Sequence, residues 1–128
     1  MKKFLTLIVI LFVSGLSAQN SEVLSNYQKV LYTVDNIQVT PEFPGGKKKF
    51  NEFVKTNFTN LKAKKGTEIS ISFIVEMDGT ISNVEIISDD NVGSGKELKR
   101  VLEISPKWLQ GEHEGYHVRT KINYIFKV

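Results

Sequence analysis

Cysteine is absent from the 128-residue sequence, and proline (three residues) and tryptophan (one residue) are scarce. Without cysteine the chain can form neither a disulfide framework nor a thiolate metal site. Its N-terminal apolar stretch, Phe4–Val13, has ten residues, whereas a membrane span needs about 20. The length suits one domain, which must therefore fold by burying a core rather than by cross-links.

The N-terminus has the layout of a secretory signal peptide. Lys2 and Lys3 precede the apolar stretch, and small residues lead to a predicted cleavage site after Ala18. The alternative is an uncleaved N-terminus that tethers the domain to the inner membrane. Cleavage removes two lysines and leaves 15 basic and 14 acidic residues. We therefore expect a periplasmic, nearly neutral protein, which argues against nucleic-acid binding.

The rest of the chain divides into an N-terminal extension, 19–40, and a domain, 41–128, after the signal peptide, 1–18. Val30–Val34 in the extension is rich in β-forming residues. This composition predicts a short strand. The strand would pair with a sheet edge, either in its own chain or in a partner.

The first half of the domain shows two clear periodicities. In Lys47–Phe58 the apolar residues recur at helical spacing, and in Glu68–Met77 they alternate as in a half-buried strand. Asp78-Gly79 then predicts a hairpin with a type I′ turn. The return strand, Thr80–Ser88, alternates imperfectly and predicts a β-bulge.

The second half repeats the same kinds of element. Asp89–Gly95 reads as a loop, Lys96–Ile104 as a short helix, Gly111–Gly115 as a second loop and Val118–Val128 as a strand. Each strand has one apolar face and each helix one apolar stripe. The predicted fold is α+β, with two helices on one face of a three-stranded antiparallel sheet in the order α-β-β-α-β.

Three markers stand in this order along the chain. They are PEFPGG at 41–46, the hairpin GTEISISFIVEMDGTISNVEIIS at 66–88, and SPKW at 105–108 with a following loop that ends in GYHVR. Together they resemble the C-terminal domain of the TonB family, in the form with a Pro-Glu-Phe-Pro-Gly-Gly motif. The resemblance covers Pro41–Val128. It implies a TonB C-terminal-like fold in the periplasm that takes part in energy-coupled transport across the outer membrane.

The resemblance also implies a partner and a place for it. The partner is the TonB box, a short segment of outer-membrane TonB-dependent transporters, which adds as a strand to the edge of the last strand. The expected peptide-binding edge is Val118, Arg119, Thr120, Lys121, Ile122, Asn123, Tyr124, Ile125 and Phe126. The motif segment expected near this edge is Thr40, Pro41, Glu42, Phe43, Pro44, Gly45 and Gly46.

Some features depart from the family or allow a plainer interpretation. The family leads us to expect Lys-Pro after Trp108, where this chain has Leu109-Gln110, and no proline lies between Gln19 and Thr40. The last strand can also be an ordinary edge whose cations prevent aggregation. The alternative function is therefore a soluble periplasmic scaffold, or a module that self-associates as a homodimer, with the same fold and no receptor contact.

Other candidate sites are weaker. His113 and His117 have zinc-like spacing, but glycines interrupt the stretch. Asp89-Asp90-Asn91 lacks the later glutamate of a calcium loop. A lone Trp108 before a strand is typical of a core lid rather than a binding aromatic.

Lysines cluster at 47–49 and at 62–65, which is typical of a solvated helix face, although an acidic receptor segment or anionic lipid also suits them. No serine, histidine and acid follow a catalytic order. We expect no enzyme activity, no cofactor and no small-molecule substrate.

Overall fold

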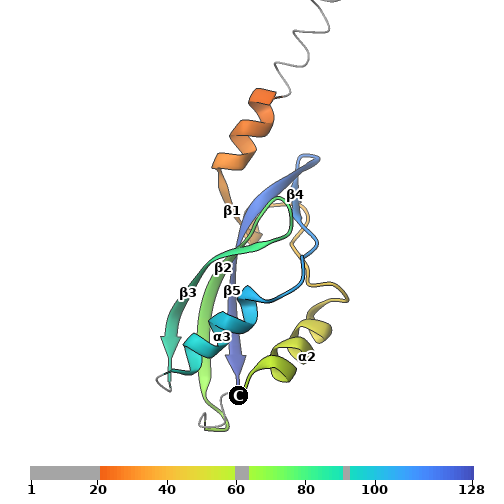
Figure 1. The fold of residues 1–128 in the computed structure, drawn as a ribbon. Helices are drawn as coiled ribbons and strands as arrows, with labels where there is room; N and C mark the ends of the chain where they lie inside the picture. The colour runs from red at the N-terminus through yellow and green to blue at the C-terminus, as the bar shows by residue number, and fades with distance from the viewer. Residues whose placement is uncertain (1–20, 60–63, 91–92) are drawn as a thin grey trace, which may run out of the picture.

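The computed structural model describes residues 21–59, 64–90 and 93–128, and Figure 1 shows their arrangement. The predicted signal peptide, 1–18, lies outside the described residues. The strands are β1 (Leu31–Thr33), β2 (Glu68–Val75), β3 (Ile81–Asp89), β4 (Gly111–His113) and β5 (Tyr116–Lys127). The helices are α2 (Lys47–Asn57) and α3 (Ser94–Glu103), with a 3-10 turn, η1 (Val34–Asn36). Residues 21–29 are also helical.

Three long strands form the body of the sheet in the order β5–β2–β3, and each pair is antiparallel. This mixed, mostly antiparallel architecture agrees with the predicted class, but the predicted layout was incomplete. β1 adds to β5 in parallel, β4 pairs with β5, and residues 21–29 add a helix. β1 corresponds to the short strand predicted at Val30–Val34, which the predicted three-stranded sheet did not include. β4 was not predicted, because a strand of three residues is too short to show an alternating pattern.

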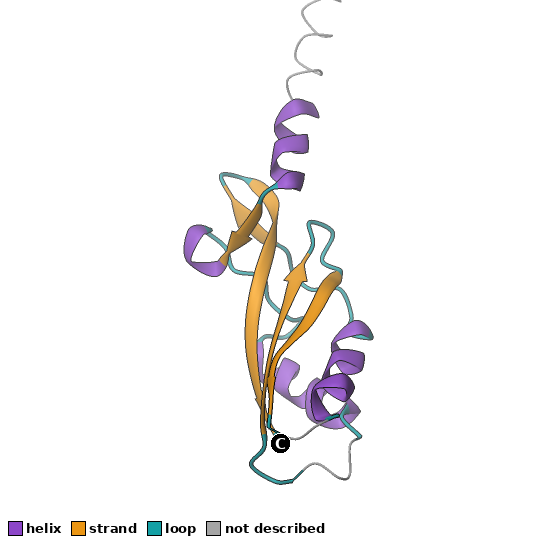
Figure 2. Ribbon diagram, turned by 90° about the vertical axis from the view of Figure 1, so that its left-hand side faces the viewer, coloured by secondary structure: helices purple, strands orange, loops and turns teal. Residues whose placement is uncertain are grey.

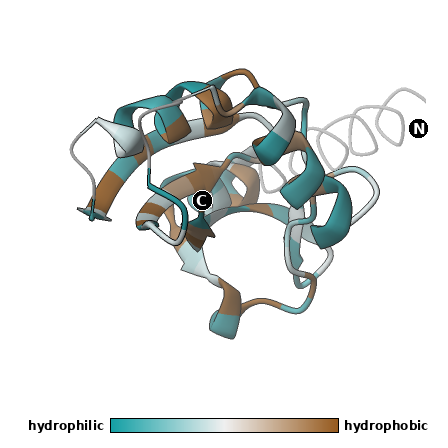
Figure 3. Ribbon diagram, turned by 90° about the horizontal axis from the view of Figure 1, so that it is seen from below, coloured by the Kyte–Doolittle hydropathy of each residue, from teal (hydrophilic) through white to brown (hydrophobic). Residues whose placement is uncertain are grey.

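The core lies between the sheet and helices α2 and α3. Alternate residues of β2 point to this side, and Ile69, Ile71, Phe73 and Val75 are fully buried there. Phe50 and Val54 of α2 and Leu98, Val101 and Leu102 of α3 complete the core from the helices. Figure 2 shows both helices on one side of the sheet, and Figure 3 shows hydrophobic strand segments beneath them. The two-layer prediction is therefore confirmed for these elements.

The β2–β3 hairpin does not use the predicted type I′ turn. Such a turn needs positive φ at both central residues, and Gly79 has a φ of 87° while Asp78 does not have positive φ. The Glu76 carbonyl accepts a bond from the Gly79 N–H at 2.9 Å, and the Glu76 N–H donates to the Thr80 carbonyl at 2.8 Å. This pattern is a three-residue loop with glycine in the left-handed position. The aspartate carboxylate instead accepts bonds from Thr80.

The two-residue turn with positive φ occurs in the β4–β5 hairpin instead. His113 pairs with Tyr116, and between them Glu114 has a φ of 52° and Gly115 a φ of 81°. These values fit a type I′ turn. This segment, Gly111–Gly115, was predicted to be a loop because two glycines flank only three residues there.

The predicted irregularity in the return strand is confirmed. The register between β2 and β3 shifts between Ser70 and Ile71 and again between Ser72 and Ile74. Asn83 lies in the second shift with a φ of 45°. The extra residues let Val84 point into the core while Ile87 stays exposed.

PEFPGG turns the chain into α2. The Phe43 carbonyl accepts a bond from the Gly46 N–H at 2.7 Å, which closes a turn with Pro44 second and Gly45 third. A φ of 88° at Gly45 fits the third position of a type II turn. Pro44 therefore precedes the helix rather than forming its first turn. Phe43 itself is buried against Phe50 and Trp108.

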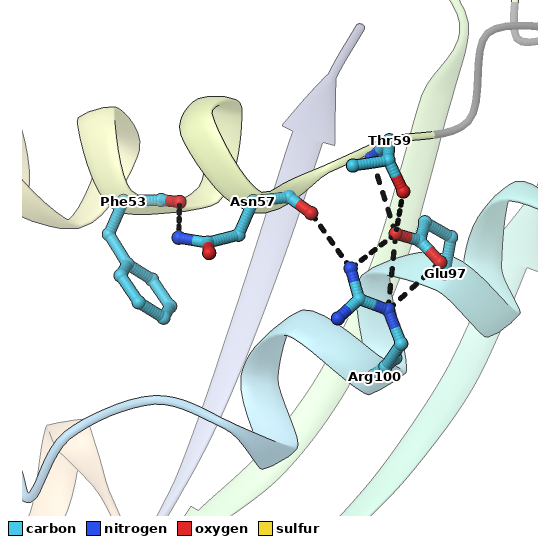
Figure 4. Close-up of polar contacts among 5 residues, drawn as sticks. All are labelled: Phe53, Asn57, Thr59, Glu97 and Arg100. Atoms are coloured by element: carbon cyan, nitrogen blue, oxygen red, sulfur yellow. Dashed lines mark hydrogen bonds and ion pairs between the residues drawn. The ribbon is translucent and has the colours of Figure 1, made fainter.

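A polar network joins the end of α2 to α3, as Figure 4 shows. Arg100 donates to the Asn57 carbonyl at 2.8 Å and to the Glu97 carboxylate at 2.6 Å. The same carboxylate accepts bonds from the Thr59 hydroxyl at 2.9 Å and from its N–H at 3.2 Å. These contacts, the Arg100 bond first, lower the pKa of Glu97 to about 2. The network satisfies a carbonyl that the helix end leaves without an intrahelical partner.

Candidate peptide-binding edge

β5 is an edge strand over half of its length. β2 pairs with one side of it from Thr120 to Lys127. On the other side, β1 pairs with Arg119, Thr120 and Lys121. Within the described residues, no strand pairs with that side from Ile122 to Lys127. The predicted edge strand is thus covered by β1 over one part only. We call the side of residues 122–127 that faces away from β2 the free edge.

The covered part shows that this edge accepts an added strand. β1 runs parallel to β5, with Leu31 opposite Arg119, Tyr32 opposite Thr120 and Thr33 opposite Lys121. The short strand predicted at Val30–Val34 therefore exists and pairs within its own chain. Because main-chain groups of an edge strand need partners, the same pairing is open to another extended segment.

The side chains of β5 alternate between the two faces of the sheet. Val118, Thr120 and Phe126 are buried on the helix side, with Tyr124 partly buried beside them. On the opposite face Ile125 is 64% exposed. An added strand at the free edge would meet an aromatic and aliphatic surface on the helix side, and on the opposite face it would meet Ile125 between the polar Asn123 and Lys127.

Arg119 is held in place on the open face of the sheet. Its guanidinium bonds to the Glu76 carboxylate at 2.7 and 3.0 Å, and Ser82 donates to the same carboxylate. The Arg119 bond is the main reason why the pKa of Glu76 is lowered. Such a bidentate ion pair fixes the position of the Arg119 side chain. Because Glu76 neutralises it, Arg119 offers little positive charge to a ligand.

Helix α2 lies beside β5 on the side of its free edge (Figure 1). The Tyr124 hydroxyl donates to the Asn51 side-chain oxygen at 2.9 Å, and the Tyr124 and Phe50 rings lie 4.7 Å apart. Burial raises the pKa of Tyr124 to about 12, so the phenol stays protonated as a donor. Next to this contact α2 has a shallow hollow lined by Lys47, Lys48, Asn51, Glu52 and Lys55. An added strand would therefore lie close to a mostly basic helix side.

Four aromatic residues and one glutamate hold the N-terminal segment to the β4–β5 hairpin, and we call this group the clasp: Tyr27, Tyr32, His113, Glu114 and Tyr116. Tyr27 stacks on Tyr116 with ring centroids 4.6 Å apart, and its hydroxyl donates to the Glu114 carboxylate at 2.8 Å. That hydrogen bond is the main reason why the pKa of Tyr27 is raised to about 12. The Tyr32 ring lies 5.5 Å from the His113 ring.

Sequence reasoning missed the clasp. Its two halves, in the extension and in the β4–β5 hairpin, lie more than 80 residues apart along the chain, and no spacing rule connects Tyr27 with Glu114. The available signal was the presence of two tyrosines, Tyr27 and Tyr32, in the extension. Such a pair is consistent with docking but does not name the surface.

The motif segment Thr40–Gly46 lies against the chain that leads into β4. Glu42 and Leu109 exchange two backbone hydrogen bonds of 3.0 and 2.8 Å, and Val39 pairs with Glu112. Pro41 lies close to Gly111, which pairs with Val118 of β5. The segment therefore lies near the covered end of the predicted edge strand.

The two histidines lie in the β4–β5 hairpin. His117 is 3.4 Å from the Glu112 carboxylate across the hairpin, and His113 is 3.9 Å from that of Glu114. Among residues 21–59, 64–90 and 93–128 no group of three or more histidines, cysteines or acids is arranged to hold a metal ion. Asp89, considered for calcium, accepts a bond from the Gly95 N–H at 2.7 Å at the start of α3.

Trp108 belongs to the core, as expected of a core lid. It is 7% exposed and makes edge contacts with Phe43, Phe50 and Phe73. Its ring N–H donates to the Ser105 hydroxyl at 3.2 Å. The tryptophan thus supports the motif segment and α2 rather than facing the edge.

The chain was also compared with known proteins. No protein-family model and no curated protein matches it. It is similar to the NMR solution structure of the Helicobacter pylori TonB C-terminal domain, with a TM-score of 0.34 and 16% sequence identity, over 66% of this chain and 86% of that chain. That structure bears the name of the family that the three sequence markers resemble. A TM-score of 0.34 is too low to carry any residue role across.

No helix in the described part of the chain combines the length and the apolar character that crossing a bilayer requires.

Proposed function

We propose that the chain binds an extended peptide segment by strand addition at the free edge of β5. The observation that carries this proposal is the pairing of β1 with the same side of β5. The edge accepts a parallel strand at Arg119–Lys121, and no strand of the described part of the chain pairs with the same side of the next residues, Ile122–Lys127. Main-chain pairing supplies affinity for a segment of almost any sequence, and flanking side chains supply selectivity.

The proposed partner is the TonB box of an outer-membrane TonB-dependent transporter. This part rests on the three sequence markers, which resemble the TonB C-terminal domain. The same resemblance and the predicted signal peptide support a periplasmic location and a part in energy-coupled transport. We propose no catalytic activity, cofactor or small-molecule substrate. The basic side of α2 near the free edge suits a segment with acidic groups.

An NMR titration tests the proposal. Isotope-labelled residues 19–128 receive a synthetic TonB-box peptide from a receptor of the same genome. Backbone amide shifts are expected along Ile122–Phe126 and, if β1 moves, also at Arg119–Lys121. The matched control is the same peptide with every second backbone nitrogen methylated, which keeps the side chains and removes strand pairing. Absence of shifts at millimolar peptide, or equal shifts with the methylated control, would contradict strand addition.

A second function is favoured by the exposure of β1. Leu31 is 43% exposed and β1 buries no residue fully, so the strand can pair with β5 of a second copy as well as with its own. The chain would then be a self-associating periplasmic module. Light scattering over a concentration series decides this point, because exchange of β1 between copies gives a dimer whose fraction rises with concentration.

A further inference from the structure

β1 occupies a place that a longer partner segment would also need. We infer that β1 is an exchangeable occupant of the β5 edge, so that β1 and an external segment exclude each other at Arg119–Lys121, and that the clasp sets how firmly β1 stays. This inference rests on the proposed function and adds its regulation. A segment that pairs along the whole of Arg119–Lys127 must first displace Leu31–Thr33.

The packing of β1 supports displacement. Its three residues include no buried one, and the flanking Val30 and Val34 are 45% and 40% exposed. Neither β1 nor η1 contributes a side chain to the core cluster. Segments with little buried apolar area and exposed backbone hydrogen bonds open at a small fraction of the global unfolding free energy.

Contacts on both sides of β1 hold it near the edge. On its N-terminal side, Tyr27 bonds and stacks with Glu114 and Tyr116. On its C-terminal side, the Gln38 side chain accepts a bond from the Glu114 N–H at 2.8 Å. Both contacts are made to the tip of the β4–β5 hairpin and not to β5 at 119–121. β1 can therefore leave the edge while at least one contact keeps it at high effective concentration.

The consequence for binding follows from competition. If β1 covers the edge in most molecules, the apparent affinity for an external segment equals its affinity for the open edge multiplied by the fraction of molecules whose edge is open. A stronger clasp then weakens binding, and a weaker clasp strengthens it. The effect is largest for segments that reach Arg119 and is absent for segments confined to the free edge.

A reversible lock tests the inference. Thr33 and Lys121 face each other across β1 and β5, and both are exposed. Because the chain has no cysteine, the double variant Thr33→Cys/Lys121→Cys can form one disulfide, and paired neighbours lie at about the separation that a disulfide needs. Oxidised and reduced forms of the same protein are then matched controls. Two probes are used: the TonB-box peptide above and a capped peptide of residues 28–36 of this chain.

In the full-length reduced variant we expect both probes to shift the amides of Arg119–Lys121. In the oxidised form these shifts should vanish and affinity should fall about tenfold. Equal binding by both forms would overturn the inference and leave the proposed function standing. Binding of the 28–36 peptide to the reduced form alone, with no response to the TonB-box peptide, would support exchange and overturn the proposed partner. No response to either probe in either form would overturn both.

Variants of the clasp supply a second readout that needs no disulfide. Tyr27→Ala removes the stack on Tyr116 and the bond to Glu114, and should raise the apparent affinity for the 28–36 peptide a few-fold. Tyr27→Phe keeps the ring and loses only the hydroxyl bond, so its affinity should lie between those of the parent and Tyr27→Ala. Unchanged affinity in Tyr27→Ala would overturn the role of the clasp.

Discussion

The body of the sheet and the N-terminal segment are held to the protein in different ways. In the body, β2 lies between two long strands and buries every residue from Ile71 to Val75. In the segment 21–39, β1 has one neighbour and no buried residue, and aromatic contacts at the hairpin tip replace a core. Burial of apolar area is the main source of stability. The difference therefore separates a fixed scaffold from a strand that can be exchanged.

The strongest test of this contrast is Phe73→Ala in β2. Phe73 is fully buried and makes an edge contact with Trp108 at a centroid distance of 5.4 Å. Loss of the ring leaves a cavity, and the free energy of unfolding should fall by about 3–5 kcal/mol. Urea unfolding followed by fluorescence measures it. Leu31→Ala in β1 is the control and should change it by less than about 1 kcal/mol. Similar losses for both variants would refute the contrast.

A second test concerns the turn that closes the β2–β3 hairpin. A Cβ at Gly79 would overlap the backbone carbonyl of Trp108, and its φ is 87°. Gly79→Ala should therefore lower the free energy of unfolding by about 2 kcal/mol or more. Gly66 has a φ of 92° but no heavy atom within 4 Å of such a Cβ. Gly66→Ala therefore tests the effect of positive φ alone, and it should lower the free energy of unfolding by about 1 kcal/mol. Equal losses in the two variants would exclude the Trp108 contact as a cause.

These two regions also differ in how far the sequence predicts them. The patterns of α2 and β2 run over eleven and eight residues, long enough to reveal a period, and both elements lie where they were expected. β4 has three residues and depends on pairing with Tyr116–Val118. Its strand character comes from its neighbour in space, which a local pattern cannot contain.

The turns and the candidate site show the same limit. Asp-Gly at 78–79 suggested a type I′ turn, whereas Glu114-Gly115 has its geometry. The number of residues between paired strands decides the turn type, and that number depends on register. The sequence predicted an edge at Val118–Phe126 by resemblance, but the cover over Arg119–Lys121 depends on a contact between Tyr27 and a hairpin almost 90 residues away.

A smaller effect is expected from pH at the junction of the two helices. The pKa of Glu97 is lowered from 4.5 to about 2, chiefly by its bond to Arg100. Because the folded state has the lower pKa, the carboxylate stabilises the fold fully above pH 4.5 and progressively less as pH falls towards 2. Urea unfolding from pH 7 to pH 2 should show this loss in the parent. In Glu97→Gln the same curve should be flatter, and an unchanged slope would contradict the assignment.

The smallest effect on global stability is expected where β1 itself is removed. Replacement of Leu31–Thr33 by Gly-Ser-Gly removes β-forming side chains and raises the entropy of the open segment. Because β1 buries no residue, the free energy of unfolding should change by less than about 1 kcal/mol.

Amide hydrogen exchange shows whether this small change is local. Exchange should accelerate at those amides of Arg119–Lys121 whose N–H groups face β1, and stay slow at Ile71 and Phe73 in the centre of the sheet. Acceleration along the whole of β2 and β5 would mean that β1 is part of the scaffold. Acceleration confined to Arg119–Lys121 would instead show that β5 keeps its place in the sheet when β1 does not cover it. Strand addition by a partner requires such an edge.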